Sequence, residues 1–212
     1  MIELGLKFTL AYLLGSVLGS MVVGQLRGGI DIRTVGSGNA GGTNALRTQG
    51  VWFALGVMVI DVGKGVVPVL VLPTLDIPGV GLDAGLSREF LTYAVGLAVI
   101  LGHVYPLWYD FHGGKGGATA IGVLGVVAPQ LVLPVVIVWL GVIAISGYVG
   151  LATVLAAAGA AAYIGVTGLP EVRWLFGFAA LVAALIVYTH RINIRRMRDG
   201  TEVRMGMMIR RK

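Results

Sequence analysis

Long apolar stretches separated by short polar segments constrain this chain more than any other feature. A helix that crosses the hydrocarbon core of a bilayer needs about 20 mostly apolar residues. Several runs of about that length follow one another here, and 57% of the 212 residues are hydrophobic whereas only 12% are charged. One soluble core of this size could not bury so much apolar surface. The sequence therefore predicts an all-α polytopic membrane protein.

The apolar runs predict seven membrane-spanning helices in one integral membrane domain over residues 1–212. Pro129 and Pro134 divide the stretch 118–151, which is too long for a single span. We expect no cleavable signal peptide, because Glu3 and Lys7 fall in the first ten residues and no cleavage pattern is evident. The predicted spans cover about 4–24, 51–72, 90–108, 118–128, 129–146, 149–166 and 174–188.

The basic residues predict the orientation of these spans. With seven spans, twelve of the 16 Lys and Arg residues fall on one face, which we predict to be cytoplasmic. The N-terminus is then outside, and the tail 191–212 lies inside, near anionic headgroups of the membrane lipids. Because the membrane explains the charge, we expect no nucleic-acid partner. The twelve residues are Arg27, Arg33, Arg47, Lys115, Arg191, Arg195, Arg196, Arg198, Arg204, Arg210, Arg211 and Lys212.

A glycine-rich segment, VGSGNAGGTNALR, lies in the first cytoplasmic loop, at about 25–50. It contains G-x-G-x-x-G, but no strand precedes it and no suitable acidic residue follows, so a dinucleotide fingerprint is excluded. It is either a flexible connection or a phosphate cradle built from backbone N–H groups. Thr43 or Asn44 is placed to cap the helix that follows. The cradle would use Gly36, Gly38, Ser37, Asn39, Thr43, Asn44 and Arg47.

A second glycine-rich segment, WYDFHGGKGGAT, occupies the loop at about 109–118. It is not a Walker A loop, since Tyr109 and Gly116 stand where a glycine and a hydroxyl residue are needed. The segment leads into a helix whose N-terminal N–H groups, with Lys115, favour an anion. The alternative is a tight turn anchored at the headgroups. Two such loops on one face favour a phosphate site that includes Gly113, Gly114 and Gly116.

Other polar side chains lie near the same face. Asp61 and Lys64, at positions i and i+3 of a span, can form an ion pair that is either functional or structural. His103 is either a packing residue or a participant in the chemistry. His190 and Asn193 share one side of the end of the last span, whose arginines can also bind headgroups.

In the order of these motifs, the chain resembles the bacterial membrane acyl-phosphate:glycerol-3-phosphate acyltransferases. The shared segments are GSGNAGGTNALR, DVGKG, GHVYP, FHGGKGGAT and HRINIRR. The resemblance implies seven helices in the bacterial cytoplasmic (inner) membrane and a cytoplasmic active site. It also implies the reaction, in which acyl phosphate acylates the 1-hydroxyl of glycerol 3-phosphate to give lysophosphatidic acid and inorganic phosphate. An enzyme that forms acyl phosphate is an expected partner.

The resemblance also assigns roles to residues. It implies catalytic or phosphate-binding positions at Ser37, Asn39, Thr43, Arg47, Lys115, His190 and Asn193. The family's usual stretch SLAS reads GLAT here, so Thr153 is expected to supply a hydroxyl that binds substrate phosphate. Asp61, Lys64 and His103 are expected to support the site.

The residue types limit the chemistry. No histidine has an aspartate at the H-x-x-x-x-D spacing, and there is no cysteine nucleophile. There is also no D-x-x-D pair, so we expect neither metal nor cofactor. The favoured mechanism is direct attack by the glycerol hydroxyl, with an oxygen of the acyl phosphate accepting the proton. Ser37 as a relay or covalent nucleophile is the competing mechanism. A transporter or channel for a phosphorylated metabolite is the alternative function.

Overall fold

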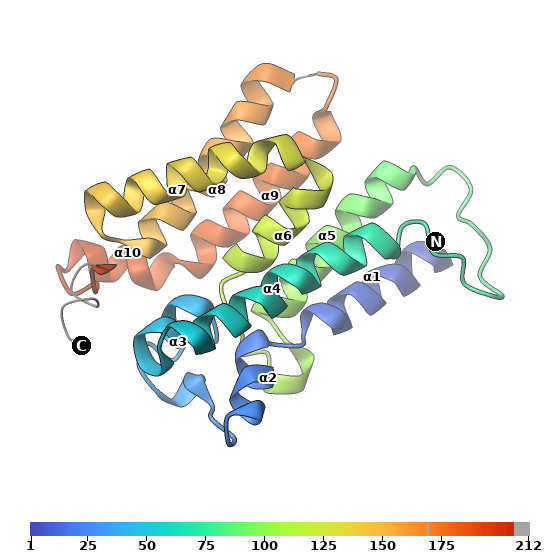
Figure 1. Ribbon diagram of the computed structural model, residues 1–212. Helices are drawn as coiled ribbons and strands as arrows, with labels where there is room; N and C mark the ends of the chain where they lie inside the picture. Colours follow the sequence, from blue (N-terminus) through green and yellow to red (C-terminus); the bar gives the residue numbers. More distant parts are fainter. Residues whose placement is uncertain (169, 206–212) are drawn as a thin grey trace. The chain divides into compact units, whose positions relative to one another are not determined.

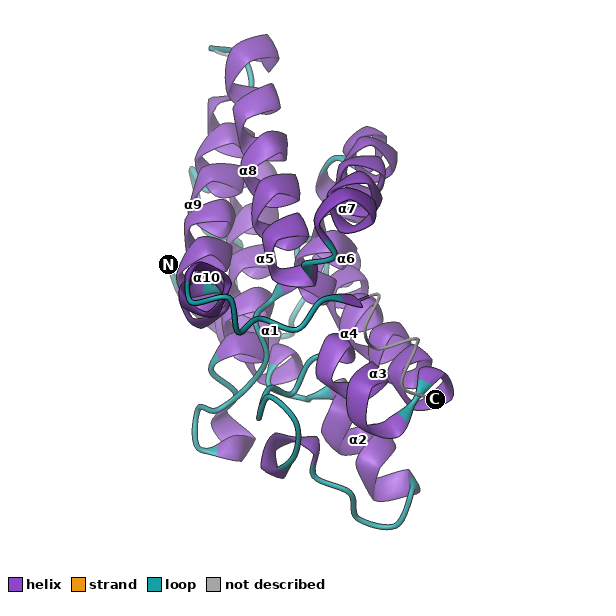
Figure 2. Cartoon of the chain, turned by 90° about the vertical axis from the view of Figure 1, so that its left-hand side faces the viewer, coloured by secondary structure: helices purple, strands orange, loops and turns teal. Residues whose placement is uncertain are grey.

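The computed structural model describes residues 1–168 and 170–205, which belong to two compact units, Met1–Val127 and Ala128–Lys212 (Figure 1). Every regular element in the described residues is helical (Figure 2). The first unit contains α1 (Ile2–Gly15), α2 (Gly19–Leu26), η1 (Ile32–Thr34), α3 (Gly42–Gln49), α4 (Val51–Val71), α5 (Arg88–Val104), η2 (Leu107–Tyr109) and α6 (Gly117–Val127). The second contains η3 (Pro129–Leu131), α7 (Val132–Ser146), α8 (Val149–Gly168), α9 (Arg173–Thr189) and α10 (Arg191–Arg198).

Helix α4 is the centre of the first unit and packs against α2, α3, α5 and α6, while α1 packs along α5. Glycines let these helices approach closely. A β-carbon at Gly15 would lie 2.2 Å from the carbonyl oxygen of Val99, so α1 and α5 meet backbone to backbone. A β-carbon at Gly122 would lie 2.2 Å from the carbonyl oxygen of Val62, which joins α6 to α4 in the same way. Small residues at such contacts are the usual means of packing helices in lipid.

The first predicted span is not one continuous helix. Helix α1 ends at Gly15 and α2 begins at Gly19, and the two axes differ by 43°. Two Gly-Ser pairs, Gly15–Ser16 and Gly19–Ser20, flank the break in an otherwise apolar run, and such pairs are a common place for a helix to kink. The backbone groups that the break leaves without helical partners are bound by two charged side chains of α4, described below.

In the second unit, α8 packs against both α7 and α9. Helix α7 ends at Ser146 and is followed by Gly147, whose φ of +75° is the left-handed conformation that glycine adopts readily after the end of a helix. The last predicted span, 174–188, agrees with α9, and the segment HRINIRR that follows lies mostly in a separate helix. Helix α9 ends at Thr189, and α10 turns away from it by 52°. The tail residues from 206 onward, including Arg210, Arg211 and Lys212, lie outside the described residues.

Four described helical segments are long and apolar enough to cross a membrane, and the number rises to six if each bent pair counts as one span. These segments match predicted spans closely, since α4 covers 51–71 and α8 covers 149–168. Helix α6 forms where a fourth span is predicted, but its 11 residues reach only about 16 Å. The four single segments are Val51–Val71, Arg88–Tyr109, Pro129–Ser146 and Val149–Gly168.

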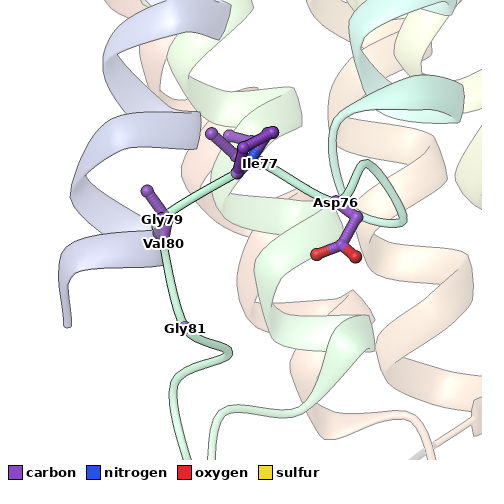
Figure 3. A pocket seen from close by; sticks show the side chains of 6 residues that line it. Asp76, Ile77, Gly79, Val80 and Gly81 are labelled. Atoms are coloured by element: carbon purple, nitrogen blue, oxygen red, sulfur yellow. The ribbon is translucent and has the colours of Figure 1, made fainter.

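The connection between α4 and α5 lies at the opposite end of these helices from the glycine-rich loops. It contains an open hollow of about 360 Å³ lined by consecutive residues of one segment, from Asp76 to Gly81 (Figure 3). Helix α5 begins after this connection, and its 17 residues rise about 25 Å before the second glycine-rich loop. The hollow is therefore separate from the predicted phosphate loops.

Candidate active site

Asn44 closes the first glycine-rich loop. Its side chain is 2% exposed, and its Nδ2 donates to the carbonyl oxygens of Ile32 at 2.8 Å and Val35 at 3.0 Å. Its Oδ1 accepts the backbone N–H of Ser37 at 3.0 Å. A β-carbon at Gly36 would lie 2.3 Å from Asn44 Oδ1, so only glycine fits there. The sequence predicts Asn44 as a phosphate contact, whereas in the structure its amide holds the shape of the loop.

The loop presents Ser37 at the surface beside the start of α3. Ser37 is exposed, and Asn39 Oδ1 accepts the N–H of Gly41 at 3.0 Å. Gly41 is the N-cap of α3, so the predicted cap at Thr43 or Asn44 is wrong. Among the described residues no side chain caps this helix, which leaves a suitable position for an anion. Thr43 lies in the first turn of α3 and Arg47 in the last, both partly buried.

The second glycine-rich loop has an unusual backbone. Asp110 and Phe111 take left-handed conformations with φ of +52° and +59°, which non-glycine residues seldom adopt. The N–H of Phe111 donates to Pro106 O at 3.0 Å, which helps to hold this conformation. The partly buried Lys115 lies between Gly114 and Gly116, two residues before α6 begins at Gly117.

Arg33 joins the two loops. Its Nη1 donates to the carbonyl oxygen of Tyr109 at 3.3 Å, and its guanidinium lies 5.2 Å from the centre of the Tyr109 ring. Asp31 fixes the other side of the guanidinium, with Oδ2 2.7 Å from Nη2. The hydrogen bond from Arg33 lowers the pKa of Asp31, and the same bond raises the pKa of Arg33. Sequence reasoning used Arg33 only to orient the chain, and the one local signal is the D-x-R spacing.

Asp61 and Lys64 form the predicted ion pair, with Nζ 3.1 Å from Oδ1. Lys64 Nζ also donates to the carbonyl oxygens of Gly15 at 2.9 Å and Val17 at 2.6 Å, after the end of α1. Asp61 Oδ1 accepts the N–H of Gly19 at 3.0 Å, at the start of α2. The positive Lys64 therefore binds the negative end of the α1 dipole, and the negative Asp61 binds the positive end of the α2 dipole. This geometry favours the structural interpretation of the pair, since it stabilises the break between α1 and α2.

His103 extends this cluster toward the second loop. It is 2% exposed, and its Nδ1 lies 3.5 Å from Asp61 Oδ1. Four buried polar atoms of the first unit have no hydrogen-bond partner among the described residues. They are Ser20 Oγ, Asp61 Oδ2, His103 Nδ1 and Thr119 Oγ1.

In the second unit, His190 and Asn193 are both buried at the junction of α9 and α10. His190 Nδ1 lies 2.8 Å from the carbonyl oxygen of Ile186. Asn193 Nδ2 donates to Glu202 Oε1 at 2.6 Å, and Arg196 Nε donates to Glu202 Oε2 at 2.7 Å. Glu202 thus fixes Asn193, a role that sequence reasoning missed because nine residues separate them.

Thr153 keeps the predicted hydroxyl at the start of α8. Its Oγ1 donates to Val149 O at 2.9 Å and accepts from Trp139 Nε1 at 3.1 Å. Gly150 replaces the first serine of the family's pattern, and a β-carbon there would lie 3.1 Å from Asn193 Cβ. Close packing of α8 on α10 therefore accounts for the glycine.

The described residues contain no group of three or more His, Cys, Asp or Glu side chains placed to bind a metal ion. In the first unit, Arg33 brings the two glycine-rich loops together, and the loops carry Ser37, Arg47 and Lys115. These hydroxyl, guanidinium and ammonium groups suit phosphate or another anion.

Comparison with known proteins identifies the family. The family model described as glycerol-3-phosphate acyltransferase matches residues 6–200. The chain belongs to the glycerol-3-phosphate acyltransferase family. Its relatives include the Aquifex aeolicus glycerol-3-phosphate acyltransferase, 42% identical over 194 residues, covering 92% of this chain and 95% of the relative. That of Geobacter sulfurreducens is 38% identical over 194 residues, with 92% and 93% covered.

Two crystal structures of PlsY, an integral membrane glycerol 3-phosphate acyltransferase, resemble this acyltransferase over nearly its whole length. The glycerol 3-phosphate form has a TM-score of 0.81 and 38% identity, covering 95% of this chain and 94% of that chain. The lysophosphatidic acid form has a TM-score of 0.80 and 36% identity, with 97% and 98% covered. The chain is thus an all-helical integral membrane acyltransferase, and the family favours acyl transfer over the transporter alternative.

Proposed function

We propose that this acyltransferase takes its acyl group from acyl phosphate and transfers it to the 1-hydroxyl of glycerol 3-phosphate. The products are lysophosphatidic acid and inorganic phosphate. The observation that carries the proposal is the pair of glycine-rich loops, joined by Arg33, that present Ser37, Arg47 and Lys115. The related structures, named for glycerol 3-phosphate and lysophosphatidic acid forms, agree with this substrate and product.

The reaction needs no protein base in this proposal. The C1 hydroxyl oxygen of glycerol 3-phosphate attacks the acyl carbonyl carbon, and the bond from that carbon to the phosphate oxygen breaks. The hydroxyl proton passes to an oxygen of the departing phosphate. Arg47 and Lys115 balance the negative charge that develops there, and Ser37 donates a hydrogen bond. The loops contribute by positioning the two anionic substrates.

We assign supporting phosphate contacts to Asn39, Thr43, Thr153, His190 and Asn193. Gly36, Gly38, Gly113, Gly114 and Gly116 allow backbone N–H groups to approach the substrates. The hydrogen bonds from Asn193 and Arg196 to Glu202 hold this part of the second unit in a fixed conformation. Asn193→Ala should therefore lower activity, and full activity of Asn193→Ala would remove Asn193 from the assignment.

The deciding assay uses purified protein with palmitoyl phosphate and glycerol 3-phosphate. Lys115→Ala and Arg47→Ala should each lower the rate by about 10²–10³, because each removes a full charge next to the leaving phosphate. Arg27→Ala, which removes an exposed arginine from the same connection, is the matched control and should retain activity. Palmitoyl thioesters of coenzyme A and of acyl carrier protein should be inactive, so that a separate enzyme must supply acyl phosphate.

Rapid mixing with acyl phosphate alone separates direct transfer from a covalent intermediate. We expect no burst of inorganic phosphate before glycerol 3-phosphate is added. A burst equal to the enzyme concentration, with acyl label on Ser37, would replace direct transfer by serine catalysis. Thioester activity equal to that of acyl phosphate would contradict the proposed donor.

We also propose seven membrane segments, with α6 as the short fourth, in the bacterial cytoplasmic membrane. The N-terminus and the α4–α5 connection would be outside, and the glycine-rich loops and α10 would be cytoplasmic. The chain has no cysteine, so single exposed cysteines test this directly. Thr34→Cys and Asp199→Cys should react only from the cytoplasmic side, and Asp76→Cys only from outside. Labelling of Thr34→Cys and Asp199→Cys from opposite sides would exclude seven segments.

A further inference from the structure

The imidazole of His103 packs against the backbone of the second glycine-rich loop. The backbone carbonyl of His103 accepts the N–H of Gly114 at 3.0 Å. A β-carbon at Gly114 would lie 2.0 Å from His103 Nε2, so the loop backbone rests directly on the ring. A β-carbon at Gly113 would lie 2.1 Å from the carbonyl oxygen of His103. The loop is therefore seated on both the backbone and the side chain of one buried residue.

Asp61 in turn limits the orientation of that ring. Its Oδ1 lies 3.5 Å from His103 Nδ1, on the other side of the imidazole from Gly114. Asp61 is itself held by Lys64 at 3.1 Å and by the N–H of Gly19 at 3.0 Å. The carboxylate is 1% exposed, so it has little room to move. A continuous path of contacts therefore runs from α4 through the imidazole to Gly114, the residue that precedes Lys115.

We propose that Asp61 and His103 are positioning residues for Lys115. They contact no substrate. They act by fixing the position of the loop backbone from which the Lys115 side chain extends. This proposal rests on the proposed function, in which Lys115 balances charge on the leaving phosphate. A displacement of about 1 Å in such a group can lower the rate by as much as 10²-fold.

A suppressor experiment tests the contact between the ring and the loop. Gly114→Ala places a methyl group where the imidazole lies, and should lower kcat/KM at least about tenfold by lifting the loop. His103→Ala also lowers kcat/KM, since it removes the support. The double variant should be at least about fivefold more active than Gly114→Ala alone, because the new methyl group occupies the space that the ring leaves.

Gly113→Ala is the matched control. Its added methyl group meets the carbonyl oxygen of His103 rather than the ring, so His103→Ala should give no recovery in that background. Recovery of Gly113→Ala, or no recovery of Gly114→Ala in folded protein, would overturn the proposal. Melting temperature and elution volume in detergent establish that each variant is folded.

A second cycle tests the contribution of Asp61 without any change in the loop. Asp61→Asn and His103→Gln are measured singly and together. If Asp61 acts through the imidazole, the double variant loses no more activity than the worse single variant. Losses that multiply would show that Asp61 acts elsewhere and would remove it from the proposal. Lys115→Ala distinguishes failure of the positioning proposal from failure of the proposed function, since a fully active Lys115→Ala would refute the proposed function itself.

Discussion

Two clusters of charged side chains lie in the first unit, one near the beginning of α5 and the other near its end. The Glu3 network consists of Glu3 and Lys7 of α1 with Arg88 of α5. The Asp61 cluster consists of Asp61 and Lys64 of α4 with His103 of α5. Both contain a carboxylate that is 1% exposed, yet they differ in how completely their hydrogen bonds are satisfied.

Both carboxylate oxygens of Glu3 have partners. Oε1 accepts from Lys7 Nζ at 2.8 Å and from Arg88 Nη1 at 2.5 Å. Oε2 accepts from Arg88 Nη2 at 2.9 Å and from the N–H of Asp83 at 3.0 Å. Lys7 and Arg88 also donate to the carbonyl oxygen of Pro73. A closed network of this kind fixes one conformation and leaves no buried atom for other chemistry.

The Asp61 cluster remains incomplete. Its Oδ1 contacts Lys64, Gly19 and His103, while Oδ2 has no partner among the described residues. The incompletely paired Asp61 cluster lies next to the second glycine-rich loop. The fully paired Glu3 network lies next to the α4–α5 connection, for which we propose no role. Buried charge alone therefore does not distinguish the two ends. Of the two clusters, only the Asp61 cluster holds buried atoms without a hydrogen-bond partner among the described residues, next to the loop for which we propose a role.

The largest expected effect is the loss of stability on breaking the Glu3 network. Glu3→Ala leaves the buried Lys7 ammonium without its carboxylate, and we expect the melting temperature to fall by roughly 5–10 °C. Activity per folded molecule should stay near that of the wild type, because the network lies at the other end of α5. Differential scanning fluorimetry in detergent, with the assay on the folded fraction, measures both quantities.

Glu171→Ala is the control for this prediction, since it removes an exposed glutamate from the second unit. It should change the melting temperature by less than about 1 °C. Asp61→Ala should also lower the melting temperature, because it leaves the buried Lys64 ammonium without its carboxylate, but here activity per folded molecule should fall as well. Equal losses of activity per folded molecule in Glu3→Ala and Asp61→Ala would contradict the prediction that only the Asp61 cluster affects activity.

Much of the fold follows from local sequence, and the exceptions have long-range causes. Apolar composition places α4 and α9 within one or two residues of the predicted spans. The Gly-Ser pairs around Ser16 are a local signal of the break between α1 and α2. The side chains that bind its backbone groups, Asp61 and Lys64, lie more than 40 residues away and cannot be predicted locally. Apolar composition predicts which residues form a span, but it does not predict which backbone groups a distant side chain binds.

The candidate site shows the same limit. Ser37 and Lys115 lie in the loops that the sequence predicts. The side chain of Asn44 is of a type that binds phosphate, but its donors and acceptor bind backbone groups of its own loop. The bridge from Arg33 to Tyr109 joins segments 76 residues apart, so no pattern in either loop predicts it.

The smallest expected effect concerns the Asp31–Arg33 pair, which belongs to the loop end but lies near the surface. The two side chains are 28% and 24% exposed, so the pair should contribute only about 0–1 kcal/mol. Arg33 lowers the pKa of Asp31, so the folded protein releases this proton more readily than the unfolded chain. The contribution is therefore complete above the ordinary carboxyl pKa near 4 and is lost as pH falls through the lowered value.

Asp31→Asn should accordingly lower the melting temperature by about 1–3 °C at pH 7. The difference from the wild type should shrink as the pH falls below about 4 and vanish once the pH is below the lowered pKa of Asp31. Salt at 1 M should reduce the difference, because the pair is partly solvated. Asp76→Asn, which removes an exposed carboxylate from the α4–α5 connection, is the control and should change the melting temperature at pH 7 by less than about 1 °C. A pH-independent difference in Asp31→Asn would mean that the side chain acts through the hydrogen bond to the N–H of Arg33 rather than through its charge. In either case the fall in melting temperature should be far smaller than that of Glu3→Ala. Water solvates an exposed charge that has lost its partner, whereas a buried charge such as Lys7 is left without any partner.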